Sequence, residues 1–338
     1  MTASTPAPYP STAAPRHSRA LPLHVGTRGS RLAVTQTRMF IDRIATFCPV
    51  LRGQNAFVEH IIRTTGDIVQ DRPLAEIGGK GLFAKEIHEA LADQRVDFAV
   101  HSLKDLETTL PSGIVLACTM TREDARDALL LAPGLVVRDP ANPLAAIPHG
   151  ALVGTASVRR QAMLRALRPD LVIVPLRGNI DRRLAKLEAD NLKTGSMAAI
   201  VLAQAGLVRI GLGNRADALL DPEVFVPAGC QGIVGITCRG ADHELVALLG
   251  AIEDPVSAAV ARAERALLAA LDGSCRTPVG GHARIIDGTL HLTGLVMRVD
   301  GSFALKRAVH GAPAEAALLG DELGRSLRRD SPDDILAA

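Results

Sequence analysis

Short apolar stretches alternate with amphipathic ones along most of this chain, and that alternation restricts its fold more than any other feature. LHVGT (23–27), AFVEHIIR (56–63) and FAVHSL (98–103) have the character of strands, and the segments between them have helical periodicity. Ser30 stands where the first helix would begin and can serve as its N-cap. Strands and helices in this order predict a mainly parallel sheet covered by helices.

A second set of the same kind follows. ALVGT (151–155) leads into a helical stretch closed by Pro169, and LVIVPL (171–176) is a continuous apolar run, as expected of a buried parallel strand. Asn179 is a good N-cap for the next helix. The stretch 225–238 returns to strand character and could cross back to complete the first sheet.

The C-terminal part has a different pattern. Asp254-Pro255 opens a helix that runs to Leu271, three strands follow with Asp287-Gly288 and Asp300-Gly301 as hairpin signals between them, and a final helix occupies roughly 313–329. We therefore predict an α/β protein with a small α+β domain at its C-terminal end. The predicted limits are 1–22 for a disordered extension, 23–122 with 226–245 for a discontinuous first α/β domain, 123–225 for a second, and 246–338 for the α+β domain.

Composition excludes several classes of protein. The chain has no Trp, one Tyr and only seven Phe, a scarcity of aromatics that argues against stacking of single-stranded nucleic acid, and its net charge is only +2. Residues 1–22 are rich in Pro, Ala, Ser and Thr and hold no acid, which favours a disordered extension; a transit peptide can look similar, although this one would be short. With no secretory signal and no apolar run near the ~20 residues of a membrane helix, we expect a cytoplasmic protein without a membrane partner.

The densest chemical signal is basic. Seven arginines lie between 155 and 186 against two aspartates, and arginine suits bidentate contact with carboxylate or phosphate. Arg165 and Arg168 fit solvated helix faces. We interpret the arginines that begin an element, where ligands of α/β sheets usually dock, as binding residues. These are Arg159, Arg160, Arg177 and Arg183.

Other candidates stay open on the residues alone. Asp105, at the end of a strand, could hold a developing cation or shuttle a proton, or it could only form a turn. His101, inside the apolar strand, fits a hydrogen-bonded core histidine. GGKGLF (78–83) lacks the spacing of a phosphate loop and suggests a flexible loop before a helix. Cys275 lies in a Gly/Ser loop, and because the five cysteines show no CxxC pair or recurrent zinc spacing, neither a disulfide framework nor a metal site is expected.

Nine collinear stretches, which cover nearly everything from about 24 to 285, resemble the porphobilinogen deaminase (hydroxymethylbilane synthase) family. They are VGTRGSRLAVTQT, GDIVQDRPLAEIGGKGLFAKEIHEAL, DFAVHSLKDL, REDARDAL, GTASVRRQAMLRALRPDL, LRGNIDRRLAKL, AAIVLAQAGLVRIGL, PAGCQGIVGI and LDGSCRTPVGGHA. The resemblance implies three domains, of which the first two are hinged lobes like those of periplasmic binding proteins, and a monomer. It also implies a dipyrromethane cofactor held by a thioether to a loop cysteine, here Cys275. The implied reaction is a stepwise deaminative condensation of four porphobilinogen molecules on that cofactor, followed by hydrolysis to hydroxymethylbilane.

The resemblance also implies roles for single residues. Asp105 matches the catalytic carboxylate. The positions that match cofactor-binding residues are Cys275, Lys104, Asp105, Thr155, Ser157, Arg159 and Arg160. The positions that match substrate-binding residues or the loop beside them are Arg28, Ser30, Gln36, Lys80, Phe83, Arg177, Arg183, Arg209 and Gln231. The chain departs from the family pattern at Glu76, Ala156, Arg182 and Cys230, where a basic residue, serine, threonine and glycine are usual.

Two other functions fit part of the sequence. A non-catalytic bilobal small-anion binding protein would also have two α/β lobes and arginines, but it gives no reason for Cys275. A transferase acting on a phosphate ligand would use the arginines as phosphate clamps, but the chain has neither a P-loop nor a Gly-x-Gly-x-x-Gly fingerprint. Condensation of porphobilinogen accounts for the arginines, because each pyrrole carries an acetate and a propionate.

Overall fold

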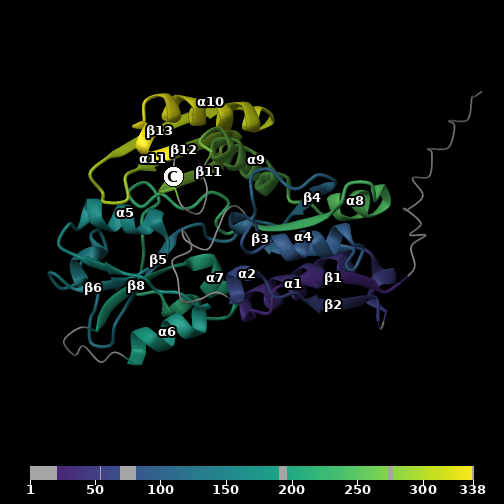
Figure 1. The fold of residues 1–338 in the computed structure, drawn as a ribbon, viewed down its shortest axis with the longest axis horizontal. Coiled ribbons are helices and arrows are strands. Elements are labelled where there is room, and N and C mark those ends of the chain that lie inside the picture. Colours follow the sequence, from purple (N-terminus) through teal and green to yellow (C-terminus); the bar gives the residue numbers. More distant parts are fainter. Residues whose placement is uncertain (1–20, 54, 69–80, 190–195, 273–276, 337–338) are drawn as a thin grey trace, which may run out of the picture.

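The computed structural model describes residues 21–53, 55–68, 81–189, 196–272 and 277–336. Three sheets organise these residues, each with its own helices (Figure 1). Two sheets have five strands each and form lobe 1 and lobe 2, and the third sheet, with three strands, lies over the junction between the lobes. The predicted extension up to residue 20, Glu76, Lys80 and Cys275 lie outside the described residues.

Lobe 1 is a mixed sheet in the order β2-β1-β3-β10-β4. β1 pairs in parallel with β2 and β3, whereas β10 lies antiparallel between β3 and β4, so the stretch 225–238 does return to the first sheet. The strands are β1 Leu23–Thr27, β2 Phe57–Ile61, β3 Phe98–Ser102, β4 Ile114–Thr119 and β10 Val234–Arg239. The helices are α1 Arg31–Phe47, α2 Thr65–Ile68, α4 Lys85–Ala92 and α8 His243–Gly250.

Helix α1 begins where the sequence predicts. The Ser30 hydroxyl accepts a hydrogen bond from Ala33 N at 3.3 Å and so satisfies one of the free N–H groups of the first turn. Phe40 of this helix is fully buried and meets Phe98 of β3 edge to face, with 5.5 Å between ring centroids. Because β1 and β3 are parallel, the loops that follow them lie at the same edge of the sheet.

Lobe 2 is a mixed sheet in the order β7-β6-β8-β5-β9. The stretch 171–176 does form a strand parallel to β6, but the prediction that it is buried is wrong: β7 has a neighbour on one side only, and Val172 is 48% exposed. The strands are β5 Asp127–Leu131, β6 Leu152–Gly154, β7 Val172–Val174, β8 Met197–Ala203 and β9 Ala218–Leu219. The helices are α5 Val158–Leu167, α6 Ile180–Ala189 and α7 Gln204–Arg209.

The third part is an antiparallel sheet with two helices against it. Asp254 caps the first helix by accepting from Ser257 N at 2.7 Å, and both predicted Asp-Gly hairpins connect neighbouring strands. The final helix begins at Ala316, after a 3-10 turn at Pro313–Glu315. The elements are α9 Pro255–Ala270, β11 Val279–Ile286, β12 Thr289–Met297, β13 Ala304–Gly311, α10 Ala316–Arg329 and α11 Asp333–Leu336. Among the described residues, no helix is both long and apolar enough to cross a membrane.

The chain crosses between the lobes twice, at 120–126 and at 220–233, and the third part holds both crossings. Glu264 of α9 is fully buried and accepts a hydrogen bond from Arg122 Nη1, on the first crossing, at 2.7 Å. It also accepts from Cys230 N on the second crossing, and from a backbone N–H of β11 at 2.5 Å. One buried carboxylate therefore ties the third part to both crossings.

Replacing Glu264 tests this connection. Glu264→Ala should lower the free energy of unfolding by about 3–5 kcal/mol, because it leaves the Arg122 guanidinium without its carboxylate and two backbone N–H groups unpaired. Urea unfolding followed by circular dichroism measures the change. Glu322→Ala, at an exposed position of α10, is the control and should change the free energy by less than about 0.5 kcal/mol. Equal losses in the two variants would contradict the role of Glu264.

Candidate functional site

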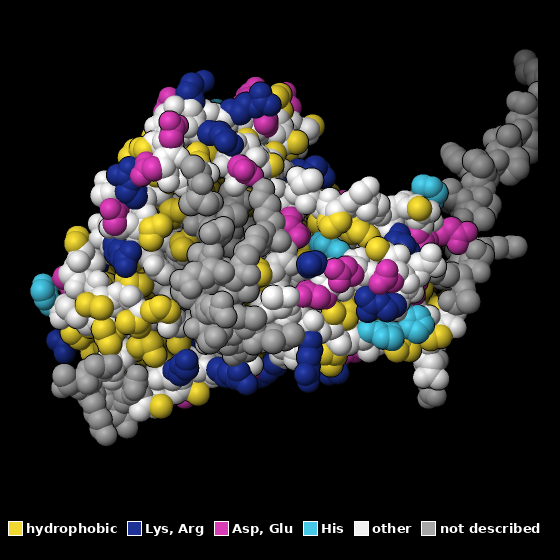
Figure 2. Space-filling model, viewed as in Figure 1, with side chains coloured by type: hydrophobic (Ala, Val, Ile, Leu, Met, Phe, Trp, Pro, Cys, Tyr) yellow, Lys and Arg dark blue, Asp and Glu magenta, His cyan; other side chains and the backbone are white. Residues whose placement is uncertain are grey.

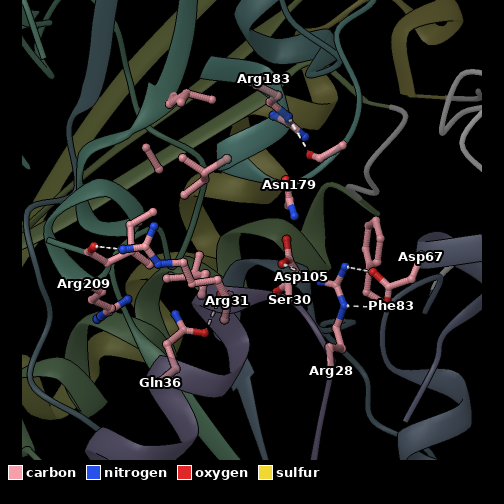
Figure 3. Close-up of a pocket in the computed structure, with 18 of the residues that line it drawn as sticks. Arg28, Ser30, Arg31, Gln36, Asp67, Phe83, Asp105, Asn179, Arg183 and Arg209 are labelled. Atoms are coloured by element: carbon pink, nitrogen blue, oxygen red, sulfur yellow. Dashed lines mark hydrogen bonds and ion pairs between the residues drawn. The ribbon is translucent and has the colours of Figure 1, made fainter. Parts of the chain in front are cut away.

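A cavity of about 850 Å³ opens between lobe 1 and lobe 2 (Figure 3). Lobe 1 contributes the loops after β1 and β3 and the start of α1, and lobe 2 contributes the start of α6 and the segment around α7. Of the described residues that line it, nine are basic and three are acidic, so the cavity suits a ligand with several negative charges. On the face shown in Figure 2, Lys and Arg side chains gather along the lower margin, beside α6 and below α7 and α2.

Most of the predicted site residues meet at this cavity. Those that line it are Arg28, Ser30, Gln36, Phe83, Lys104, Asp105, Arg160, Arg177, Arg183 and Arg209. Four others do not line it: Thr155, Ser157, Arg159 and Gln231. Lys80 and Cys275 lie outside the described residues, so their places in the site stay predictions. Of the four positions that depart from the family pattern, Ala156 and Arg182 line the cavity.

Asp105 lies where the chain leaves β3 through a 3-10 turn, Leu103–Asp105. Its Oδ2 is 3.9 Å from Arg28 Nη1, and its side chain is 34% exposed. The same guanidinium binds Asp67 more closely, with Nη2–Oδ1 at 2.5 Å, and lies over the ring of Phe83 at 4.2 Å from the centroid (Figure 3). Because Arg28 already has a nearer anion, the Asp105 carboxylate is left to face the cavity and can interact with a cationic part of a ligand.

Asp67 is a site residue that the sequence interpretation missed. Burial would raise the pKa of its carboxyl, but the hydrogen bond and charge of Arg28, together with Thr64 Oγ1 at 2.8 Å, hold that pKa below its usual range. Asp67 therefore stays ionised and keeps Arg28 beside Asp105. The signal that could have found it is its place soon after a parallel strand, at the edge of the sheet where ligands dock.

Lobe 2 brings arginines together. Arg183 Nε donates to Gly178 O at 2.8 Å, and Gly178 has φ +111°, a conformation that favours glycine. Burial, and then the charges of Arg160 and Arg177, lower the pKa of Arg183 to about 10. A lowered pKa means that the cationic form is held at a cost, and an anion that enters between these guanidiniums relieves it.

In the two lobes, two buried guanidinium nitrogens have no hydrogen-bond partner within the described ranges: Arg159 Nε and Arg209 Nε. Arg209 lines the cavity, and its Nη2 donates to Gly232 O at 2.5 Å. Arg159 has its other nitrogens on Asp127 Oδ2 at 2.7 Å and Val226 O at 2.6 Å. A buried N–H without an acceptor is costly, so Arg209 Nε indicates a place at the cavity that a ligand oxygen would fill, whereas Arg159 lies behind the cavity wall.

Three predicted binding residues act on the protein itself. The Ser157 hydroxyl caps α5 by accepting from Arg160 N at 3.4 Å, and Thr155 Oγ1 accepts from Ser157 N at 3.2 Å. Gln231 Oε1 accepts from Lys104 Nζ at 3.1 Å. These contacts hold the first turn of α5 and the Lys104 ammonium in position, and Arg160 of that turn and Lys104 line the cavity.

The structure corrects the interpretation of two arginines. Arg165 Nη1 donates to Val299 O at 3.0 Å, and Arg168 Nη1 donates to Leu144 O at 2.6 Å. The prediction of solvated helix faces is therefore wrong, because a guanidinium on a helix surface can reach backbone carbonyls of neighbouring segments, which helical periodicity does not reveal.

Two other predictions concern the core. His101 is a core histidine as predicted: its Nε2 lies 2.9 Å from Thr237 Oγ1, and burial lowers its pKa to about 3. Cys230 has φ +62°, a conformation that favours glycine, the residue that the family resemblance leads one to expect there. Burial also raises the pKa of the Cys230 thiol to about 12, so that thiol is not a nucleophile.

A contact across the mouth of the cavity was also missed. Arg31, at the start of α1 in lobe 1, has Nη1 at 3.1 Å from Asp181 Oδ1 of α6 and donates from Nη2 to Ile210 O at 2.8 Å. Both acceptors belong to lobe 2. No group of three or more His, Cys, Asp or Glu that could hold a metal ion occurs in the part of the chain that the structure describes.

Known families account for nearly the whole described chain. The family model "Porphobilinogen deaminase, dipyromethane cofactor binding domain" matches residues 23–247, and the model "Porphobilinogen deaminase, C-terminal domain" matches residues 258–329. The first match contains every strand of both lobes and every residue that lines the cavity.

Curated relatives are similar over most of their length. A porphobilinogen deaminase of Syntrophobacter fumaroxidans is 43% identical over 305 residues, which is 90% of this chain and 94% of the relative. Those of Nitrobacter hamburgensis and Roseiflexus castenholzii are 45% and 46% identical, over 90% and 93% of this chain and 92% and 98% of the relatives. A solved ancestral cationic amino acid solute binding protein is 13% identical at a TM-score of 0.42, over 68% of this chain and 87% of its own, a similarity too weak to support an argument.

Lys104 gives a test of the electrostatics of the cavity. Burial lowers the pKa of its ammonium to about 8, so in the ligand-free protein Lys104 loses its proton as the pH rises through about 8. Competitive acetylation of lysines, followed for each peptide by mass spectrometry, should show half-maximal reactivity of Lys104 near pH 8. Lys85, whose side chain is 74% exposed, is the internal control. Reactivity of Lys104 that follows the same pH curve as Lys85 would contradict the burial effect.

Proposed function

This chain belongs to the porphobilinogen deaminase family and carries that family's dipyrromethane cofactor-binding domain, and from this premise we propose how its residues divide the work. The proposed reaction joins four porphobilinogen molecules stepwise with loss of ammonia and ends in hydrolysis to hydroxymethylbilane, which makes the protein a transferase. The observation that carries the proposal is the carboxylate of Asp105 in a cavity with nine basic residues, where the other two carboxylates, Asp67 and Asp181, are each bound to an arginine within 3.1 Å. A non-catalytic small-anion binding protein would use the cations but would have no need of this carboxylate.

The residues of the cleft fit a dipyrromethane held on Cys275. Such a group carries an acetate and a propionate on each ring, and these carboxylates can supply the acceptor that Arg209 Nε, at the cavity, does not have within the described residues. Arg159 binds Val226 O, and Val226 lies against Gly280, a few residues after Cys275 in the chain. When bound, the dipyrromethane supplies the pyrrole carbon to which the first porphobilinogen is joined. We propose that Cys275 forms the thioether and that the carboxylates are held by Lys104, Arg159 and Arg160, with Thr155 and Ser157 shaping the loop before α5.

Asp105 is the proposed catalytic residue. When ammonia leaves porphobilinogen, positive charge develops on the pyrrole, and a carboxylate that faces the cavity stabilises that charge. Asp105 also accepts or returns a proton as the new bond forms. Arg28, 3.9 Å away, does not neutralise Asp105, because Asp67 binds Arg28 more closely.

The other residues of the cleft bind the acetate and propionate groups of porphobilinogen and of the growing chain. Arginines from both lobes take part, so the ligand is held between them. The proposed substrate-binding residues are Arg28, Ser30, Gln36, Lys80, Phe83, Arg177, Arg183, Arg209 and Gln231. Of these, Gln231 acts through Lys104, and Lys80 belongs to the loop outside the described residues.

We further propose that the protein works as a cytoplasmic monomer. Its partner is the small-molecule substrate porphobilinogen, and it binds neither nucleic acid nor a membrane. The four cysteines of the described residues, Cys48, Cys118, Cys230 and Cys238, are free thiols, which suits a reducing compartment. Both walls of the cavity come from one chain, which supports a monomer.

Intact mass tests the cofactor site. The purified protein should exceed its sequence mass by two condensed porphobilinogen units, and Cys275→Ser should show no excess, because serine does not form the thioether. Cys48→Ser, at a free cysteine of lobe 1, is the control and should keep the added mass. Wild-type protein with no added mass, before and after incubation with porphobilinogen, would rule out the proposed cofactor.

Turnover tests the catalytic carboxylate. Asp105→Asn should lower kcat by about 100- to 1,000-fold, because the amide keeps the shape of the side chain but does not stabilise positive charge. Hydroxymethylbilane is measured by converting it to a porphyrin by oxidation and recording the absorbance of that porphyrin. Asp321→Asn, on an exposed turn of α10, is the control and should retain full activity. An Asp105→Asn variant with wild-type kcat would refute the assignment.

A further inference from the structure

Asp127, at the start of β5 in lobe 2, is a fully buried carboxylate with three polar partners. Its Oδ2 accepts from Arg159 Nη2 at 2.7 Å, and its Oδ1 accepts from Arg160 Nη2 at 2.7 Å and from Gln231 Nε2 at 2.9 Å. Asp127 does not line the cavity. It lies directly behind two residues assigned to the ligand, at the point where the first crossing enters lobe 2.

Gln231 carries the influence of Asp127 to the other lobe. An ionised carboxylate has no proton to donate, so Asp127 requires a donor from Gln231 and turns the NH₂ group of that amide toward itself. The same nitrogen also donates to Ala125 O at 2.8 Å. The amide oxygen is thereby turned toward lobe 1, where it accepts from Lys104 Nζ at 3.1 Å. The orientation of one amide on the second crossing thus decides whether Lys104 meets an acceptor or a donor.

The charges of this cluster do not cancel. One carboxylate, Asp127, serves the guanidiniums of Arg159 and Arg160 directly and the ammonium of Lys104 through Gln231. Burial would raise the pKa of Asp127, but the charges of Arg159 and Arg160 hold it well below its usual range, so the carboxylate is ionised throughout the working range of pH. The remaining positive charge is left for a ligand, and Lys104 and Arg160 both present it to the cavity.

We propose that Asp127 is a positioning residue of the deaminase: its buried carboxylate fixes Arg159 and Arg160 of lobe 2 and, through the Gln231 amide, orients the acceptor for Lys104 of lobe 1. Anion-binding groups of the two lobes thereby take their positions from one internal charge. Asp127 itself touches no ligand. A site whose cations are held in place before the ligand arrives does not have to order them during binding.

The expected effect of Asp127→Asn follows from hydrogen-bond chemistry. Asparagine presents an NH₂ group as well as an oxygen, so in the variant only Ala125 O is certain to hold the Gln231 NH₂ in its present place. With the second acceptor gone, we expect the amide to turn in part of the molecules and to point its own NH₂ at the Lys104 ammonium. The groups that face Lys104 are Asp105 on its own turn, Asp127 of β5, and Arg159 and Arg160 of α5. The negative charge of Asp127 and the hydrogen bond to Gln231 Oε1 both stabilise the protonated form of Lys104. Losing them should lower the pKa of Lys104, so that Lys104 loses its proton at lower pH.

The first measurement does not depend on activity. In Asp127→Asn prepared without bound ligand, the acetylation half-point of Lys104 should fall by about one pH unit relative to wild type. Asp217→Asn is the matched control, because Asp217 accepts from Leu131 N at 2.8 Å at the other end of β5, and it should leave Lys104 unchanged. An unchanged half-point in Asp127→Asn would overturn the proposal.

A double variant covers the case in which Asp127→Asn does not fold. Asp127→Asn with Arg159→Met removes one anion and one cation, so the net charge of the cluster stays as in wild type. Asp127 raises the pKa of Lys104 and Arg159 lowers it, so removing both charges together largely cancels their direct effects on Lys104. A fall in the acetylation half-point of Lys104 that persists in the double variant therefore reports the turned Gln231 amide. No fall in a folded double variant would overturn the role of Gln231 as the connection between the lobes.

The kinetic measurement rests on the proposed function. Asp127→Asn should raise KM for porphobilinogen by about tenfold or more, with a smaller change in kcat. The cations that hold the dipyrromethane carboxylates lose their order, so the ring to which porphobilinogen is joined is no longer fixed, while Asp105 is untouched. Asp217→Asn should keep the wild-type KM. A shifted Lys104 half-point with an unchanged KM would refute the positioning role in the reaction, whereas a wild-type protein inactive on porphobilinogen would refute the proposed function and leave the Lys104 result standing.

Discussion

Like charges gathered in one cavity repel one another, and the cleft of this protein depends on bonds that hold its arginines in place without neutralising them. Arg183 donates to the backbone carbonyl of Gly178, and Arg160 shares a single carboxylate, Asp127, with Arg159. A carbonyl orients a guanidinium but adds no net charge, and one carboxylate cannot balance two guanidiniums. The positive charge therefore remains available to ligand carboxylates. The unfavourable energy of keeping these like charges close together is compensated by the stability of the rest of the fold.

The two lobes are joined firmly at one side of the cleft and weakly at the other. At the crossings, Glu264 is fully buried, and buried charged pairs of this kind are costly to break. At the mouth, Arg31 and Asp181 are 53% and 43% exposed, and exposed ion pairs contribute little to stability. A cleft built this way can widen at its mouth while its base keeps its geometry, as a chain that grows by one pyrrole at a time requires.

The fold could be predicted from the sequence wherever local chemistry decides it. Ser30 and Asp254 cap helices, and the Asp-Gly pairs turn hairpins, because those effects act within a few residues. The burial of β7 could not be predicted, since an apolar run does not say how many neighbours a strand has. Asp127 was missed for a related reason: its partners Arg159 and Gln231 lie 32 and 104 residues away, and no local pattern relates them.

The order of strands in lobe 1 also determines how the chain must be assembled as it is made. Lobe 2 takes its sheet from one uninterrupted run, from Asp127 to Leu219, whereas lobe 1 receives β10 only when Val234–Arg239 is synthesised. Until then β3 and β4 lack the strand that lies between them, and each has an edge able to pair with another chain. Synthesis of lobe 1 therefore begins first but is completed second. During synthesis the chain passes through a stage in which all strands of lobe 2 have been made while the sheet of lobe 1 still lacks β10.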